Sequence, residues 1–117
     1  MKNQNILRRM CFALAGIRES WRSEKSFRAH VAVFLGVLML LLATRPAPLW
    51  WAMLLLADGA MMAMELINTA VEKLVDHIHP DQHSIIGVVK DTLAGAVLLS
   101  CCTGGCVLLA FLWSLWG

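Results

Sequence analysis

Three long apolar stretches leave this chain few ways to fold. They run from Ala29 to Thr44, from Leu49 to Val75 and from about Thr92 to Trp116. A helix that crosses a bilayer needs about 20 mostly apolar residues, and hydrocarbon tolerates only backbone that satisfies its own hydrogen bonds. A mean hydropathy of +0.68 over 117 residues is too high for a water-soluble domain of this size. We therefore predict an all-α membrane protein with three transmembrane helices.

Positive charge is concentrated ahead of the first apolar stretch. Residues 5–22 show helical periodicity, with apolar side chains three or four positions apart, which predicts an amphipathic helix on the membrane surface. Such a segment beside a span favours anionic headgroups over nucleic acid as its partner. By the positive-inside rule the N-terminus and the 76–91 loop are cytoplasmic. Seven of the ten Lys and Arg residues lie in this region: Lys2, Arg8, Arg9, Arg18, Arg22, Lys25 and Arg28.

The second stretch is interrupted by a row of polar side chains. At about 100° per residue they share one face of a helix. An ionised acid at the bilayer centre costs at least about 2.5–3.5 kcal/mol, so this face must meet protein, water, metal or substrate. Glu65 lies about 10 Å deeper than Glu72, a separation that suits a water-borne donor and a lipid-borne acceptor. The row comprises Asp58, Glu65, Asn68, Thr69, Glu72 and Asp76. We interpret Asp58 as a protonated core acid rather than a substrate contact.

Further polar groups are expected at the same cytoplasmic rim. Glu24 ends the surface helix, and Lys90 and Asp91 open the third span. Two carboxylates holding Mg²⁺ beside a lysine that meets phosphate is what phosphoryl transfer requires. The sequence has no glycine-rich phosphate loop, so a nucleotide site would be built from helix ends and carboxylates. The spacing of His77, His79 and His83 is unspecific, and we interpret these residues as a solvated loop rather than a metal site.

These residues also form a recognisable pattern. The run ELINTAVEKLVD at 65–76, followed by KDTLAGAV at 90–97, resembles the signature of the small bacterial integral-membrane lipid kinases, the diacylglycerol kinase and undecaprenol kinase family. GIRESWRSEKSFR at 16–28 and the ending LWSLWG at 112–117 are similar to the family as well. The resemblance implies one lipid-kinase domain over 1–117, with a surface helix at 5–25 and spans at 29–45, 49–76 and 91–116. It also implies a homotrimer in a bacterial inner membrane with active sites shared between protomers.

The resemblance also implies roles for individual residues. Glu65 would be the general base and Asn68 a positioning group at the catalytic centre, with Glu24 and Glu72 as Mg²⁺ ligands. The implied nucleotide contacts are Phe12, Glu24, Glu72, Asp76, Asp81, Gln82, His83, Lys90 and Asp91. The implied lipid contacts are Arg18, Trp21, Glu65, Ala94 and Trp113. Phe12 stands where the family commonly has tyrosine, and Asn5 where it can have arginine.

The predicted function is ATP-dependent phosphorylation of the hydroxyl of diacylglycerol, which gives phosphatidic acid, with Mg²⁺ as the cofactor. The tryptophan-rich C-terminal end favours diacylglycerol over undecaprenol, and undecaprenol kinase is the alternative. A second alternative is a non-enzymatic oligomeric scaffold or proton conduit, in which the heptad of Asp58, Glu65 and Glu72 lines a shared axis.

Overall fold

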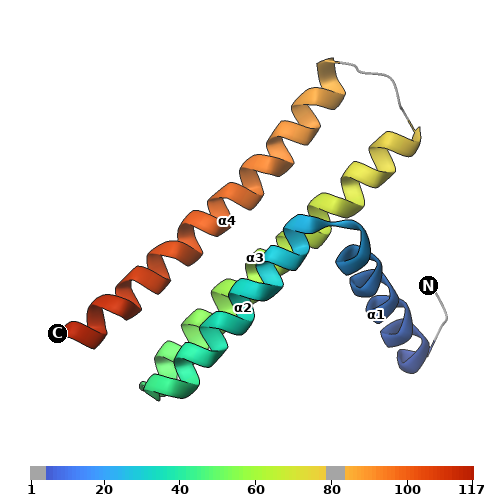
Figure 1. The fold of residues 1–117 in the computed structure, drawn as a ribbon. Helices are drawn as coiled ribbons and strands as arrows, with labels where there is room; N and C mark the ends of the chain where they lie inside the picture. Colours follow the sequence, from blue (N-terminus) through green and yellow to red (C-terminus); the bar gives the residue numbers. More distant parts are fainter. Residues whose placement is uncertain (1–4, 79–83) are drawn as a thin grey trace.

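The computed structural model describes residues 5–78 and 84–117, which form four helices and no strand. In chain order these are α1 (Ile6–Ser23), α2 (Lys25–Thr44), α3 (Pro48–Ile78) and α4 (Ser84–Trp116), as Figure 1 shows. The three longer helices are each long and apolar enough to cross a membrane. The prediction of an all-α membrane protein with an N-terminal helix and three candidate spans is confirmed.

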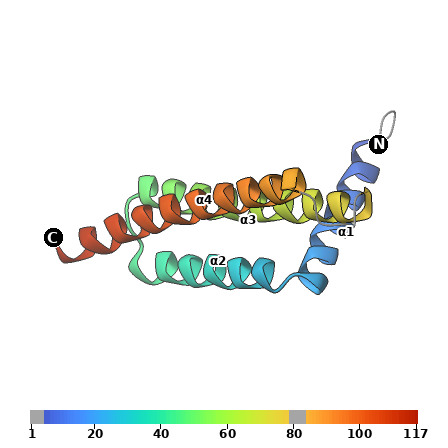
Figure 2. The ribbon, with the colours of Figure 1, turned by 90° about the horizontal axis from the view of Figure 1, so that it is seen from above.

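Helix α1 stands at an angle to the other three helices (Figures 1 and 2). It begins at Asn5, whose side-chain oxygen accepts a hydrogen bond of 2.9 Å from the backbone N–H of Arg8. Asparagine is among the best residues at this position because it satisfies an otherwise free helix N–H. The helix ends at Glu24, where extended backbone (φ −119°, ψ 112°) separates α1 from α2. Its apolar side chains are exposed in the chain, as expected for a helix that lies against lipid.

The turn between α2 and α3 is built from residues that stop one helix and start the next. Arg45 adopts a left-handed conformation (φ 46°, ψ 59°) and donates its N–H to the Leu41 carbonyl at 2.8 Å. Pro46 follows and cannot continue the helix. Pro48 then occupies the first position of α3, where a missing N–H has little cost. This short turn makes α2 and α3 antiparallel neighbours.

Helix α3 is the central element of the bundle. It packs against α2 and α4 and also contacts α1, and Figure 2 shows α2 lying to one side of the row formed by α3 and α4. Near the Arg45 turn, buried side chains of all three long helices form an apolar cluster, and the Trp50 and Phe111 rings lie 5.4 Å apart. The cluster fixes the register of the helices at this end. Its buried members are Val37, Leu41, Leu54 and Phe111.

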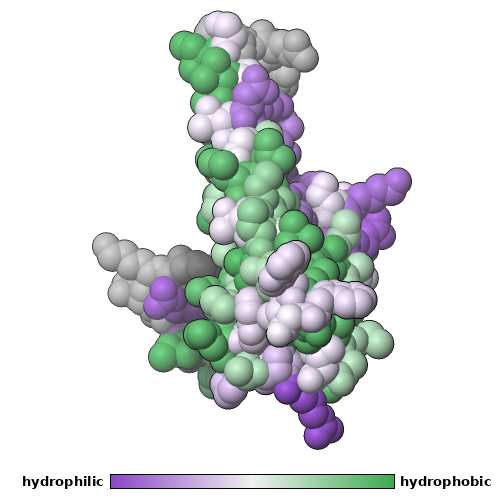
Figure 3. All heavy atoms as spheres, turned by 90° about the vertical axis from the view of Figure 1, so that its left-hand side faces the viewer, coloured by the Kyte–Doolittle hydropathy of each residue, from purple (hydrophilic) through white to green (hydrophobic). Residues whose placement is uncertain are grey.

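The outer surface of the bundle is mostly hydrophobic, as Figure 3 shows for one face. The cysteines contribute to this surface, because Cys11, Cys102 and Cys106 are exposed and Cys101 is half-buried, all with free thiols. Cysteine packs as a small apolar residue, and those of α4 lie at membrane depth, where lipid rather than protein would cover them.

Candidate active site

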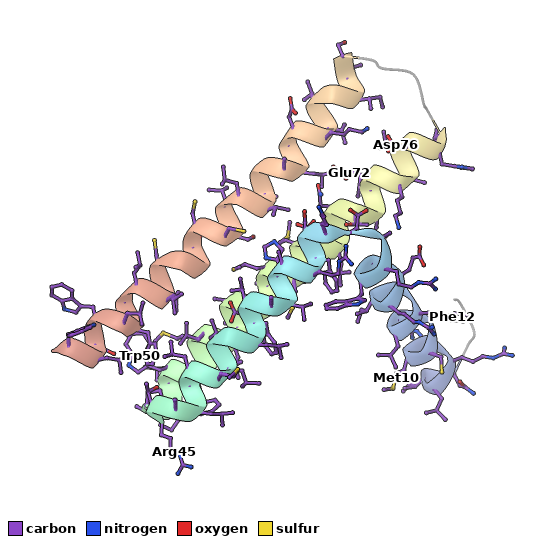
Figure 4. All side chains as sticks on the ribbon, viewed as in Figure 1. Met10, Phe12, Arg45, Trp50, Glu72 and Asp76 are labelled. Atoms are coloured by element: carbon purple, nitrogen blue, oxygen red, sulfur yellow. The ribbon has the colours of Figure 1, made fainter. Side chains whose placement is uncertain are left out.

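Four acids of α3 form a ladder that runs from the interior of the bundle to its surface. We refer to Asp58, Glu65, Glu72 and Asp76 as the carboxyl ladder. Asp58 and Glu65 are each 6% exposed, Glu72 is half-buried and Asp76 is exposed. Figure 4 shows Glu72 and Asp76 on the part of α3 that continues past α2. The ladder therefore joins a buried carboxyl to the open end of the helix.

Glu65 has a partner from the neighbouring helix. The Oε2 atom of Glu65 lies 3.6 Å from Nε2 of His30 on α2, within ion-pair distance and slightly beyond a direct hydrogen bond. Both side chains are largely shielded, with 8% of Glu65 and 15% of His30 exposed. A buried carboxyl that meets an imidazole on one oxygen keeps its other oxygen for a different partner.

The end of α1 is tied to α3 close to the ladder. Lys73 donates a hydrogen bond of 3.1 Å to the Ser23 hydroxyl, and that hydroxyl donates to the Glu19 carbonyl at 2.9 Å. This chain of bonds brings Glu24, the residue after Ser23, to the level of α3 that carries Glu72. The side chain of Glu24 makes no capping hydrogen bond at the start of α2, so its carboxylate is not used by the helix.

Two of the predicted nucleotide contacts pair with each other. Lys90 donates a hydrogen bond of 2.6 Å to Oδ1 of Asp76, across the open end of α3 and α4. Helix α4 begins at Ser84, so Lys90 and Asp91 lie inside the helix rather than at its start. The Lys90 ammonium also interacts electrostatically with Glu72. Lys90, Asp76 and Glu72 therefore make the open end of the carboxyl ladder strongly charged.

In the part of the chain that the structure describes, no three His, Cys, Asp or Glu side chains gather closely enough to hold a metal ion by themselves. Mg²⁺ is usually bound by one or two carboxylates together with substrate phosphates and water. Glu24 and Glu72 remain the carboxylate pair predicted for this role.

An apolar groove of about 570 Å³ lies between α1, α2 and α3. Its walls include Val31 of α2 and Leu66 of α3, the residues that follow His30 and Glu65 in the sequence. Arg18 and Trp21 of α1 also line it, which places two of the predicted lipid contacts on one cavity.

Other predicted contacts lie apart from this site within one chain. Trp113 is 80% exposed near the C-terminal end of α4, about 35 Å along the helix from Lys90 at 1.5 Å per residue. Ala94 is exposed one turn beyond Lys90. Phe12 lies on α1 (Figure 4), where it lines a second groove together with Thr69 and Lys73. Asp81, Gln82 and His83 lie outside the described residues.

Sequence reasoning assigned no role to His30 and Lys73, although both contact the site. An ionisable side chain in an otherwise apolar span is a functional candidate by default, and that signal singles out His30. Lys73 lies among exposed residues at the end of α3 and carries no comparable signal. Asn68, which was predicted, is half-buried, and its Oδ1 has no partner within residues 5–78 and 84–117.

Comparison with known proteins shows which family the sequence matches. The pattern of the family described as prokaryotic diacylglycerol kinase matches residues 11–112. An undecaprenol kinase of Bacillus subtilis is 37% identical over 76% of this chain and 76% of its own length. A diacylglycerol kinase of Synechocystis is 33% identical over 95% of this chain and 66% of its own length. A diacylglycerol kinase of Escherichia coli is 29% identical over 96% and 92%.

The three spans and the carboxyl ladder define a class of small integral-membrane kinases that act on lipids. Within that class, the chain belongs to the prokaryotic diacylglycerol kinase family. A non-enzymatic scaffold or conduit is therefore set aside, and the predicted enzyme class, a lipid kinase, is confirmed.

Proposed function

We propose that this kinase transfers the γ-phosphoryl group of ATP to the hydroxyl of diacylglycerol, giving phosphatidic acid. The observation that carries the proposal is the carboxyl ladder, which joins the buried Glu65 to an exposed, charged rim. The rim is open to a nucleotide from water, and an apolar groove lined partly by the same helix, at Met62 and Leu66, is available to a lipid. One site can therefore meet both substrates.

In the proposed reaction, Glu65 accepts the proton of the lipid hydroxyl as its oxygen attacks the γ-phosphorus. A new O–P bond forms, the bond between the γ-phosphorus and its bridging oxygen breaks, and ADP leaves with the electron pair. General bases contribute about 10²–10⁴-fold to such rates. The free Oδ1 of Asn68, one turn from Glu65, is placed to accept a hydrogen bond from a bound group.

Glu24 and Glu72 would hold Mg²⁺ on the nucleotide, and the metal would neutralise charge on the phosphates. Lys90 contributes a positive charge at the same rim, where it holds Asp76 in place through their hydrogen bond. Asp91, Asp81, Gln82 and His83 complete the proposed nucleotide contacts.

The apolar groove is the proposed site of the acyl chains. Its lining is almost entirely hydrocarbon and aromatic, and Arg18, whose side chain ends in a cation, contributes to one wall. Arginine at the edge of an apolar site suits the ester and phosphate oxygens of a lipid headgroup. Trp21 adds an amphipathic ring of the kind that anchors at the membrane interface.

The choice of diacylglycerol is supported by relatives named diacylglycerol kinase that match almost the whole chain. Undecaprenol is the second candidate, because a relative at 37% identity carries that name. Purified protein supplied with labelled ATP and each lipid in turn distinguishes them. Faster labelling of undecaprenol would overturn the choice.

We further propose that the enzyme works as a homotrimer in a bacterial inner membrane, with its N-terminus in the cytoplasm. Trp113 lies near the far end of α4, about 35 Å along the helix from Lys90 at 1.5 Å per residue, so a neighbouring protomer would have to bring such a residue to the site. The basic α1 and the abundance of ATP in the cytoplasm support this orientation.

Glu65→Gln is the decisive variant because it keeps the shape of the side chain and removes the base. We expect kcat to fall at least about 100-fold while the protein remains assembled. Labelled phosphatidic acid is measured against time, and assembly is followed by size-exclusion chromatography. Turnover near the wild-type rate would remove Glu65 from the mechanism. A matched control is Glu19→Gln, an exposed acid of α1 whose side chain has no proposed role in the reaction.

A further inference from the structure

We propose that His30 is a positioning residue, which holds one oxygen of Glu65 so that the other faces the lipid hydroxyl. The inference deepens the proposed function and rests on it. It adds a residue from a different helix to the catalytic centre, one to which the sequence pattern gave no role.

The contact that carries the inference joins Nε2 of His30 to Oε2 of Glu65 at 3.6 Å. The two side chains come from antiparallel helices, and both are largely buried, with 15% of His30 and 8% of Glu65 exposed. A carboxylate that is held on one oxygen loses much of its rotational freedom. A general base works only when its free oxygen lies within reach of the proton, so this restraint bears directly on the rate.

An ionisable imidazole at this position is energetically costly, and apolar packing alone would not require one. Between Ala29 and Thr44, His30 is the only ionisable side chain, and such groups are expensive inside a membrane unless they are paired. His30 also interacts electrostatically with Asp58, one heptad from Glu65. The imidazole thus lies between two buried carboxyls of α3.

The His30 contact engages Oε2 of Glu65, which leaves Oε1 for another partner. The apolar groove proposed for the acyl chains is lined by neighbouring positions of the same two helices, including Val31 and Leu66. In the proposed arrangement, Oε1 is the oxygen that accepts the proton of the lipid hydroxyl.

The test separates positioning from general structural support by comparing three substitutions. His30→Leu removes the contact, whereas His30→Gln keeps a side-chain N–H that can reach Glu65. His77→Leu is the matched control, because His77 is exposed on α3 and outside the proposed site. For each variant, kcat and KM for ATP and lipid are measured in mixed micelles, with size-exclusion elution and thermal unfolding as checks on folding.

We expect His30→Leu to lower kcat at least about 10-fold with little change in either KM, since misplacement of a base affects the chemical step. His30→Gln should recover most of this loss, and His77→Leu should behave as wild type. In a Glu65→Asp background, whose shorter carboxylate no longer meets the imidazole, His30→Leu should cost much less than in the wild type.

An unchanged kcat in His30→Leu overturns the inference, as does an equal loss in the glutamine variant or in the Glu65→Asp background. If the leucine variant does not fold, His30→Met takes its place in the same comparison. Failure of the proposed function shows differently: wild-type protein would phosphorylate neither lipid, or Glu65→Gln would remain active, whatever the His30 variants do.

Discussion

At the scale of single residues, the two buried acids of α3 have the same chemistry but different surroundings. Asp58 and Glu65 are equally exposed, at 6% each. Glu65 meets His30, whereas Oδ2 of Asp58 has no hydrogen-bond partner in the described part of the chain. An ionised carboxylate at membrane depth costs at least about 2.5–3.5 kcal/mol. This cost favours a neutral Asp58 that fills space between helices.

Asp58→Asn tests this assignment, because asparagine has nearly the same shape and carries no charge. We expect kcat within about twofold of wild type, in contrast to the loss of at least about 100-fold expected for Glu65→Gln. Both variants are assayed in the same mixed micelles at saturating ATP. A loss in Asp58→Asn as large as that in Glu65→Gln would place Asp58 in the reaction instead.

At the scale of helices, close approach of α3 and α4 depends on Gly104. This residue is buried, and a Cβ atom added there would lie 2.5 Å from Sδ of Met61. The missing Cβ atom at Gly104 leaves room for the Met61 side chain between the two helices. At the next position, a Cβ on Gly105 would meet no atom within 4 Å, so the two adjacent glycines differ only in what they face.

We therefore expect Gly104→Val to destabilise the bundle by about 1–3 kcal/mol, the usual cost of overpacking. Gly105→Val should be nearly neutral. Thermal unfolding in one detergent measures both, and Met61→Ala combined with Gly104→Val should recover part of the loss by making room. Equal destabilisation by the two valines would show that helix propensity, rather than the contact with Met61, decides the effect.

Helix ends show how far local sequence can predict this fold. The break at Glu24 and the turn at Arg45 were both predicted, because polarity and proline mark them. The third span was predicted over 91–116, and the helix that contains it begins at Ser84. Apolarity identifies the part of a helix that lies in lipid, and it does not show how far the helix continues into water.

At the scale of the whole molecule, the buried apolar cluster and the open end of the carboxyl ladder lie at opposite ends of the bundle. The apolar cluster around Leu41, Leu54 and Phe111 joins the three long helices near the Arg45 turn. The carboxyl ladder opens at the other end, where α3 and α4 continue past α2 (Figure 1). Changes in the cluster should therefore affect folding more than turnover, and changes in the ladder the reverse.

The packing of the whole molecule also shows which parts of the site could not be predicted from the sequence. The shared face of the ladder follows from helical periodicity along α3 alone. The contact of His30 with Glu65 depends on the register between two helices, which neither helix specifies by itself. The link between Ser23 and Lys73 likewise spans 50 residues of sequence. Helical periodicity predicts which residues share one face of a helix. Contacts between residues of two different helices depend on how the helices pack, so periodicity does not predict them.

The orientation of the molecule can be tested with its own cysteine. Cys11 is exposed on α1, and the proposed orientation places it in the cytoplasm. With the three cysteines of α4 replaced by alanine, an impermeant maleimide should label Cys11 in inverted vesicles and leave it unlabelled in intact spheroplasts. Cys11→Ala combined with Ala47→Cys, in the exposed turn after α2, should give the opposite pattern. Detergent-permeabilised cells should label both. Labelling of Cys11 from outside intact cells would put the acidic rim where ATP is absent, and the proposed reaction could not occur there.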